Sequence, residues 1–371
     1  MKIESIEVII VDIPTIRAHK LSFGSVSVQN YALVRMVCDG IAGIGEAATI
    51  AGPMWGDESV ETIKIIIDKY LAPLLLGQDP RNPNRLGQII EKGVSGNRFA
   101  KAACEMAAWD LAARLREMSL SDLLGGRVHD SLPVAWTLAA GDSVRDIEEG
   151  QEMLRQRRHN IFKLKIGAKT PQQDFANVSA ICKALAADAH IRVDVNQAWS
   201  ELDAAYWIPR FAEIGVAVFE QPIAKWNVAG MARLAQANIA AIMADECVDT
   251  LASAFSVIAA GAADSISLKP AKSGGLAVTR KIAALAEAAG IALYGGTMLE
   301  TAIGTACSAH LYATLPQLAH GCELFGHLLL RDTITANALE IRDFNLIVPS
   351  GPGTGMVIDE DKLAFYRRSD S

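Results

Sequence analysis

The sequence predicts an α/β protein in which an N-terminal α+β domain precedes a (β/α) barrel. Three observations favour this fold class. The first part of the chain has antiparallel strand patterns, short aliphatic runs alternate with helical segments from Leu132 onward, and charged residues stand near the ends of the central runs. With 371 residues, 51% of them hydrophobic, the chain is long enough for two domains with large cores.

The N-terminal part is typical of an antiparallel sheet followed by a helix. ESIEVIIVDIP alternates, and YALVRMV and IAGIGEAA flank Cys38, Asp39 and Gly40, where Asp-Gly suits a tight hairpin. Asn97 is expected to cap a long helix over FAKAACEMAAWDLAARLREM, because this stretch is rich in Ala and Leu.

The rest of the chain contains eight candidate strands that alternate with stretches rich in Ala, Leu, Arg and Glu. In order they are PVAWTLA, FKLKIG, IRVDVN, VAVFEQP, AAIMADE, SISLKP, IALYGGT and GCELFG. Eight strands that alternate with helices of this size indicate a (β/α) barrel.

Charged residues near the ends of five central strands form a structural period. They are 29, 26, 25 and 24 residues apart, and they are Lys165, Asp194, Glu220, Asp245 and Lys269. Because the C-terminal ends of barrel strands converge on one mouth, these groups are expected to meet there. Acids in such positions also cap helices. Lysines in the same positions cannot cap a helix N-terminus, so a functional cluster is the better interpretation.

The three acids predict a metal site. Asp194, Glu220 and Asp245 come from consecutive strands and supply only oxygen ligands, which suit Mg²⁺ or Mn²⁺ better than zinc. Without a cation, three converging carboxylates repel one another and their pKa values rise. A bound divalent ion is the simpler solution.

The stretch FKLKIG places Lys163 and Lys165 on the same face of one strand. Two ammonium groups about 6.7 Å apart repel by about 2.5 kcal/mol at an effective dielectric constant of ~20, which lowers one pKa by nearly ~2 units. Lys165 is therefore expected to exchange protons near neutral pH as a general acid or base, with Lys163 tuning it.

A metal flanked by amines suits a reaction in which the carbon next to a carboxylate gains or loses a proton. The metal stabilises the enolate-like intermediate and an amine handles the proton. Spacing alone leaves racemisation, elimination and cycloisomerisation open. A non-catalytic barrel is disfavoured because every ligand and lysine of the cluster is present.

The motifs FKLKIG, RVDVNQAW, FEQP, MADE, SLKPAKSGG and YGGTMLE, in this order, resemble the muconate lactonising subgroup of the enolase superfamily. The resemblance covers essentially the whole chain. It implies a modified (β/α)7β barrel at residues 129–345, an α+β capping domain at 1–128, and a tail at 346–371 that packs back on the cap.

The resemblance also implies roles for individual residues. Lys165 is then the acid or base with Lys163 beside it, Lys269 lies across the substrate, and Glu323 is the acidic residue of the last strand, to which the family assigns proton donation. The implied metal ligands are Asp194, Glu220 and Asp245. The implied substrate-contacting residues are Ile50 and Trp55 in the capping loop TIAGPMWGDES, together with Asn196, Ser267, Thr297 and Phe325.

By resemblance, the expected reaction is the metal-dependent cycloisomerisation of cis,cis-muconate to muconolactone in aromatic catabolism. Chloromuconate is the alternative substrate, since Trp55 and Ser267 resemble chloromuconate enzymes whereas Ile50, Lys272 and Phe325 resemble ordinary muconate enzymes. A more remote alternative is a dipeptide epimerase or N-acylamino acid racemase. Dipeptide epimerases, however, have an Asp-x-Asp pair where this chain reads CELF.

The charge and cysteine content limit which binding partners and which compartment are expected. The net charge of -7 is spread along the chain without a basic stripe, so neither nucleic acid nor a membrane surface is expected as a partner. Six scattered cysteines without a CxxC pair, and an N-terminus without a signal-peptide core, indicate the cytoplasm. The expected partner is a small dicarboxylate, and the resemblance implies a homo-oligomer, an octamer by family expectation.

Overall fold

The computed structural model describes residues 1–21, 24–50 and 52–369, so Ala51 of the expected capping loop lies outside it. The chain begins with an antiparallel sheet of order β1-β2-β3, comprising β1 (Ser5–Leu21), β2 (Gly24–Cys38) and β3 (Ile41–Thr49). Cys38 pairs with Ile41 across a turn whose central residues, Asp39 and Gly40, have φ of 49° and 74°. The predicted hairpin is confirmed, because two positive φ angles are what its tight turn requires.

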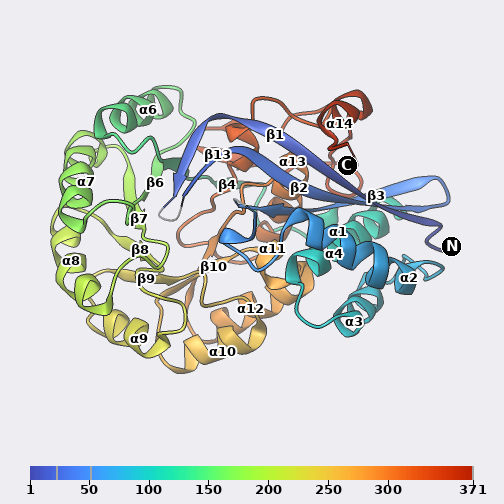
Figure 1. Cartoon of the computed structure of the whole chain (residues 1–371), viewed down its shortest axis with the longest axis horizontal. Coiled ribbons are helices and arrows are strands. Elements are labelled where there is room, and N and C mark those ends of the chain that lie inside the picture. The colour runs from blue at the N-terminus through green and yellow to red at the C-terminus, as the bar shows by residue number, and fades with distance from the viewer. Residues whose placement is uncertain (22–23, 51, 370–371) are drawn as a thin grey trace.

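Helices of the N-terminal part pack beside this sheet (Figure 1). They are α1 (Val60–Ile66), a π-helical segment (Ile67–Leu71), α2 (Ala72–Leu75), α3 (Pro83–Gly93), α4 (Arg98–Arg114) and α5 (Leu120–Leu123). Almost every side chain of α4 is buried, since this helix packs on β2 and β3 and also contacts α11 (Pro270–Ser273) of the barrel.

The predicted capping of α4 by Asn97 is wrong. Asn97 precedes the helix with φ of 51°, in the left-handed region, and its side chain makes no capping hydrogen bond. The carboxylate of Glu58 accepts hydrogen bonds from the backbone N–H groups of Phe99 (2.8 Å) and Ala100 (3.1 Å) instead. A cap from a distant segment gives no local pattern in the sequence.

Seven parallel strands in the order β11-β10-β9-β8-β7-β6-β5 form the barrel wall. The strands are β5 (Trp136–Leu138), β6 (Ile161–Lys165), β7 (His190–Asp194), β8 (Val218–Glu220), β9 (Ala241–Ala244), β10 (Ser265–Leu268) and β11 (Ala292–Gly295). The eighth predicted strand, GCELFG, is reduced to Cys322, which bridges Val134 on one side and Gly295 on the other, both in parallel. This residue closes the ring, so the fold is the predicted (β/α)7β barrel.

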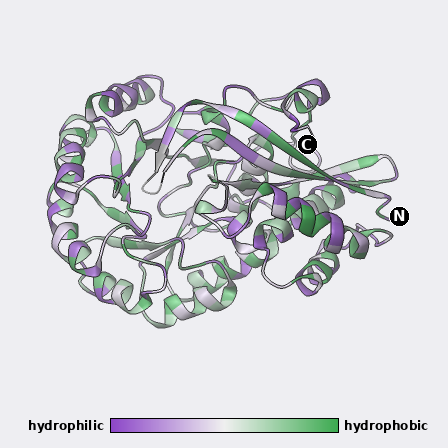
Figure 2. Ribbon diagram, viewed as in Figure 1, coloured by the Kyte–Doolittle hydropathy of each residue, from purple (hydrophilic) through white to green (hydrophobic). Residues whose placement is uncertain are grey.

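Helices surround the strands, as Figure 1 shows along its left and lower sides. Besides α11 they are α6 (Ser143–Arg155), α7 (Pro171–Leu185), α8 (Glu201–Glu213), α9 (Val228–Gln236), α10 (Leu251–Ala259), α12 (Leu276–Ala288) and α13 (Ala302–Tyr312). Figure 2 shows hydrophobic residues along the strands and hydrophilic stretches on the outer helices. None of the helices in the described part of the chain is long and apolar enough to cross a membrane.

The C-terminal residues return to the N-terminal domain. A small antiparallel sheet joins β4 (Ser131–Pro133), β13 (Asn345–Ile347) and β12 (Ile341–Arg342), and α14 (Glu360–Tyr366) contacts β1. The backbone N–H of Arg368 donates to the carbonyl of Ile10 at 2.9 Å, and its guanidinium pairs with Asp12 at 2.6 Å. The boundaries at residues 128 and 345 stay a prediction.

Two buried glutamates of the N-terminal domain cap helices of the barrel. Glu46 on β3 accepts hydrogen bonds from the backbone of Thr301 (2.9 Å) and Gly304 (3.1 Å) at the start of α13. Glu105 on α4 does the same for Leu276 (2.7 Å) and Ala277 (3.0 Å) at the start of α12. These carboxylates tie the two parts of the molecule together through helix N-termini.

Glu46 is expected to make stability depend on pH. Burial raises its pKa to about 7 from 4.5, although hydrogen bonds from Thr301 and Gly304 oppose the shift. The folded protein thus holds a proton that the unfolded chain releases, and this stabilising contribution is lost as pH rises through about 7. Relative to wild type, the free energy of unfolding of Glu46→Gln should rise by about 2–3 kcal/mol between pH 5 and pH 8. Denaturant unfolding of both proteins at pH 5 and pH 8 measures this change. A difference in free energy of unfolding between variant and wild type that does not depend on pH would contradict the prediction.

Candidate active site

The five periodic residues lie together at the C-terminal ends of the strands. Lys165, Asp194 and Glu220 are the last residues of β6, β7 and β8, and Asp245 and Lys269 directly follow β9 and β10. The parallel register places Lys165 opposite Asp194, and Asp194 opposite Glu220. The acids are not helix caps, because the following helices are capped by other side chains, those of Ser200, Asn227 and Thr250.

Lys163 lies at the centre of the acidic cluster. Its ammonium nitrogen is 3.2 Å from Asp194, 3.0 Å from Glu220 and 2.5 Å from Glu323, and the residue is 1% exposed. Burial lowers the pKa of Lys163, but the charges of Glu220, Glu323 and Asp194 outweigh burial and hold the pKa well above its usual value. Three carboxylates therefore stabilise the ammonium group of Lys163, and the acid–base role expected for Lys165 stays a prediction.

Lys165 is placed differently from Lys163. Its ammonium donates to Asp194 at 2.6 Å and to the side-chain oxygen of Asn196 at 2.9 Å. Asn196 has φ of 44°, a left-handed conformation that asparagine tolerates better than most residues. The side chain of Lys165 keeps 12% of its surface exposed, whereas that of Lys163 keeps 2%, so Lys165 is the more accessible of the two to a ligand.

On the opposite side of the mouth, two lysines hold Asp245. Lys269 lies 2.6 Å and Lys272 2.8 Å from its carboxylate. Lys272 also donates to the backbone carbonyls of Asp245 and Ser267. Sequence reasoning treated Lys272 only as a marker of substrate preference, although its place one helical turn after Lys269 is a signal that both face the same site. The ring of Trp55 lies over Lys269, 4.5 Å from the ring centre to the ammonium nitrogen.

The acids fit a hard divalent ion. Burial and then the charge of Asp194 raise the pKa of Glu220 to about 8, and its Oε1 atom is buried without a hydrogen-bond partner. At Asp245 burial raises the pKa, but Lys269 and Lys272 outweigh it and the pKa lies below its usual value. Within residues 1–21, 24–50 and 52–369 no three acidic, histidine or cysteine side chains stand in ligating geometry by themselves. The ammonium of Lys163 contacts two of the three carboxylates, whose oxygen-only donor set suits Mg²⁺ or Mn²⁺.

A small cavity of about 20 Å³ lies between these lysines and the N-terminal domain. The residues lining it are His19, Ile50, Trp55, Lys163, Lys165, Lys269, Thr297, Leu299 and Glu323. Three of them come from outside the acidic cluster and were expected: Ile50, Trp55 and Thr297. Ser267 and Phe325 are buried and do not line this cavity, and Phe325 packs on Trp136 with ring centres 5.1 Å apart. Their role in substrate binding stays a prediction.

His19 of β1 also lines this cavity. It reaches the cavity because the hairpin of β1 and β2 extends toward β6 (Figure 1). The residue is 1% exposed, and burial, reinforced by the charges of Lys165 and Arg17, holds its pKa well below the usual value. A neutral imidazole is thus the form present near Lys165.

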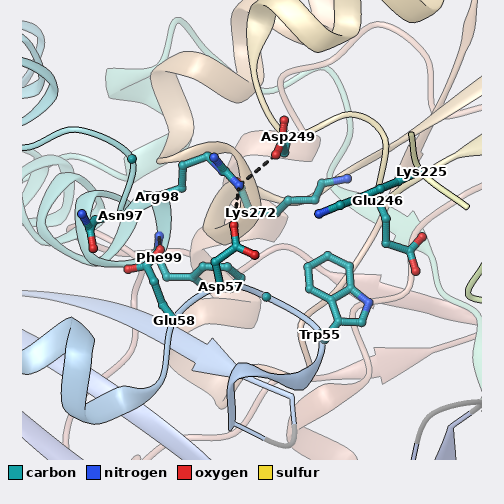
Figure 3. Close-up of a pocket in the computed structure, with 12 residues that line it drawn as sticks. Trp55, Asp57, Glu58, Asn97, Arg98, Phe99, Lys225, Glu246, Asp249 and Lys272 are labelled. Carbon is teal, nitrogen blue, oxygen red and sulfur yellow. Dashed lines mark hydrogen bonds and ion pairs between the residues drawn. The ribbon is translucent and has the colours of Figure 1, made fainter. Parts of the chain in front are cut away.

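A larger pocket of about 130 Å³ adjoins the site on the side of Trp55 (Figure 3). Arg98 crosses it and pairs with Asp249 at 2.8 Å and Asp57 at 3.6 Å, linking α4, the capping loop and the barrel. Glu246, which sequence reasoning missed, faces Trp55 across this pocket in Figure 3. The two successive acids Asp245 and Glu246 after β9 were a signal in the sequence.

Fold and site together define a class of enzyme: a capped barrel that gathers carboxylates and amines at the C-terminal ends of its strands. Two family models match, the N-terminal domain of the mandelate racemase / muconate lactonizing enzyme family over residues 5–125 and the enolase C-terminal domain-like family over residues 145–362. The chain therefore belongs to the enolase superfamily, as its motifs predicted.

Whole-length relatives lie within this family. The chain is 49% identical over 369 residues to a chloromuconate cycloisomerase of Cupriavidus necator, covering 100% of both chains. It is also 49% identical over 369 residues to muconate cycloisomerase 1 of Pseudomonas putida, covering 99% of this chain and 98% of the other. Among solved structures, a muconate lactonizing enzyme from Pseudomonas fluorescens complexed with muconolactone superposes with a TM-score of 0.97 at 51% identity, covering 99% of each chain.

Proposed function

We propose that this protein catalyses the cycloisomerisation of cis,cis-muconate to muconolactone with a divalent metal, Mn²⁺ or Mg²⁺. The observation that carries the proposal is the pair of amines on opposite sides of one carboxylate cluster, Lys165 beside Asp194 and Lys269 beside Asp245. Such an arrangement suits a substrate that carries negative charge at both ends and takes up a proton beside one carboxylate.

The proposed metal ligands are Asp194, Glu220 and Asp245, which also gather the positive charges of the site. When bound, the metal supplies electrostatic stabilisation for the negative charge that develops on the substrate carboxylate. Lys163 holds Asp194, Glu220 and Glu323 at fixed positions through its three contacts.

In the proposed reaction, one carboxylate oxygen of muconate bonds to the carbon that is β to the other carboxylate. The electrons of that carbon–carbon double bond move to give an enolate, and Lys165 delivers a proton to the α carbon. The protein holds the attacking oxygen near its target, so the ring closes without the entropy cost of an encounter. Ile50 and Trp55 must move for the six-carbon substrate to enter, since the cavity has room for about one water molecule.

Chelation of the metal is expected to abolish turnover. Stabilisation of the developing charge is worth several kcal/mol, so dialysis against a chelator should lower the rate by at least about 10²-fold. Adding Mn²⁺ or Mg²⁺ back should restore it, and comparing the two ions at equal free concentration identifies the better one. Full activity in a chelated sample shown by elemental analysis to be free of metal would contradict this proposal.

The experiment that tests the proposed function follows the loss of diene absorbance when the protein is mixed with muconate and Mn²⁺. We expect muconolactone as the product. An absence of turnover by the wild-type protein refutes the proposal. Exchange of an α proton of a dipeptide or N-acylamino acid in deuterated water, without turnover of muconate, would favour the more remote alternative.

Chloromuconate is the second candidate substrate. Chloromuconate and muconate cycloisomerases match this chain at the same identity of 49%, and the residues that distinguish them in sequence are mixed here. Comparison of kcat/KM for muconate, 2-chloromuconate and 3-chloromuconate decides between them, and product analysis shows whether chloride is released.

We also propose that the protein is a cytoplasmic homo-oligomer whose binding partner is a small dicarboxylate substrate. All six cysteines are buried and free, as predicted, which supports a reducing compartment. Light scattering of the purified protein measures the subunit number, for which an octamer is the expectation.

A further inference from the structure

Glu246 contacts the proposed acid–base lysine through one intermediate side chain. The Nδ2 group of Asn196 donates to Oε1 of Glu246 at 3.1 Å, and Oδ1 of the same amide accepts from Lys165 at 2.9 Å. Both contacts lie largely out of solvent, since Asn196 is 7% and Glu246 6% exposed. The three side chains come from different strand ends, those of β6, β7 and β9.

The chemistry of the three groups permits only one orientation of the amide. An ammonium group has no acceptor atom, so it needs the amide oxygen, and this leaves the amide nitrogen to donate to the carboxyl group of Glu246. Asn196 must therefore turn Oδ1 toward Lys165 and Nδ2 toward Glu246. The backbone N–H of Asn196 also donates to Asp194 at 3.0 Å, so this residue contacts both the lysine and its ionic partner.

We propose that Glu246 is a positioning residue that orients Asn196 and thereby aims the Lys165 ammonium at the reacting carbon. This inference rests on the proposed function, in which Lys165 delivers the proton. It assigns a role to Glu246 that is separate from metal binding, although the residue adjoins Asp245. The second oxygen of Glu246, Oε2, has no partner among the described residues and makes no contact that this role requires.

Two substitutions separate orientation from charge. Glu246→Gln and Glu246→Ala both remove the negative charge, but only the glutamine keeps an oxygen that accepts from Asn196, and its amide nitrogen can occupy the place of the unpartnered Oε2. Glu246→Ala should lower kcat by about 10- to 100-fold, the usual cost of losing a supporting hydrogen bond at a catalytic site. Glu246→Gln should recover most of this loss.

A double-mutant cycle with Asn196→Ala tests whether Glu246 acts through the amide. If it does, adding Glu246→Ala to the Asn196→Ala variant lowers kcat by less than about 2-fold, because the pathway is already broken. The Mn²⁺ dissociation constant of Glu246→Ala, measured by calorimetry, should stay close to wild type. Additive losses in kcat, equal losses in the alanine and glutamine variants, or a large loss of Mn²⁺ affinity in Glu246→Ala would each overturn the inference.

A substrate-free measurement keeps this inference distinguishable from the proposed function. Crystal structures of the two Glu246 variants should show the Asn196 side chain displaced from Lys165 in the alanine variant, where its Nδ2 group has lost its acceptor, and in place in the glutamine variant. An unchanged amide in Glu246→Ala overturns the inference whether or not muconate is the substrate. Failure of the wild-type protein to convert muconate refutes only the proposed function.

Discussion

Replacing Lys165 with alanine is expected to lower kcat on muconate by about 10²- to 10⁴-fold, the contribution of a positioned general acid. The fold should survive, because Asp194 keeps Lys163 as a partner at 3.2 Å after the Lys165 ammonium is removed. KM should change much less than kcat if the ammonium acts mainly in the proton-transfer step. Steady-state kinetics with saturating metal measures both parameters.

A matched control for this variant is Lys183→Ala. Lys183 lies exposed in the last turn of α7, on the outer helical layer of the barrel, and should leave kcat unchanged. Turnover by Lys165→Ala within about 3-fold of wild type would refute the acid–base role, since general acid–base catalysis accounts for at least about 10²-fold.

Replacing Lys163 with methionine is expected to have the largest effect on stability. The substitution leaves Asp194, Glu220 and Glu323 buried together without their shared counter-ion. Removing one partner of a buried ionic cluster costs about 3–5 kcal/mol, because the remaining charges cannot return to water. Denaturant unfolding of the metal-free protein measures the loss, and turnover should be lost as well.

Lys101→Met is the matched control for buried lysines. Lys101 is 4% exposed, yet it pairs only with Glu91, whose side chain is 65% exposed. Because Glu91 regains water when its partner is lost, this variant should lose about 1 kcal/mol or less. Equal losses for the two lysine variants would show that burial of the lysine, and not its carboxylate cluster, determines the cost.

Added Mn²⁺ should recover part of the stability of Lys163→Met, since a divalent ion can neutralise the same carboxylates. The rise in melting temperature on adding Mn²⁺ should be larger for Lys163→Met than for the wild-type protein at the same Mn²⁺ concentration. A ligand that binds only the folded state stabilises it by an amount that grows with the logarithm of ligand concentration over Kd, so thermal unfolding over a series of Mn²⁺ concentrations gives this comparison. An identical response of the two proteins would argue against a shared site for the lysine and the ion.

Much of the fold could be predicted because barrel strands leave a repeated local pattern. The strand-end residues from Lys165 to Lys269 recur at nearly constant spacing, and such a period has few structural explanations. The hairpin at Asp39 could also be predicted from the sequence, because its turn requires residues that tolerate a positive φ. By contrast, the last predicted strand is reduced to Cys322, which bridges Val134 and Gly295. Its length depends on how these neighbouring strands are placed and not on its local sequence.

The errors have a common physical cause. Glu58, and not Asn97, caps α4, and the charges that hold the pKa of Lys163 high come from Glu220, Glu323 and Asp194. Both outcomes depend on groups that are distant in the chain. Glu246 was missed for the same reason, because its partner Asn196 lies 50 residues away and only the folded barrel brings them together.

The lining of the small cavity has two origins. His19, Ile50 and Trp55 come from the N-terminal domain, whereas the lysines and Glu323 come from the barrel. Thr297 and Leu299 shape the space from the barrel, but the other uncharged part of the lining is thus encoded apart from the lysines and Glu323. Evolution or laboratory selection can alter which molecule is accepted by changing the first 60 residues, while the proton-transfer apparatus stays untouched.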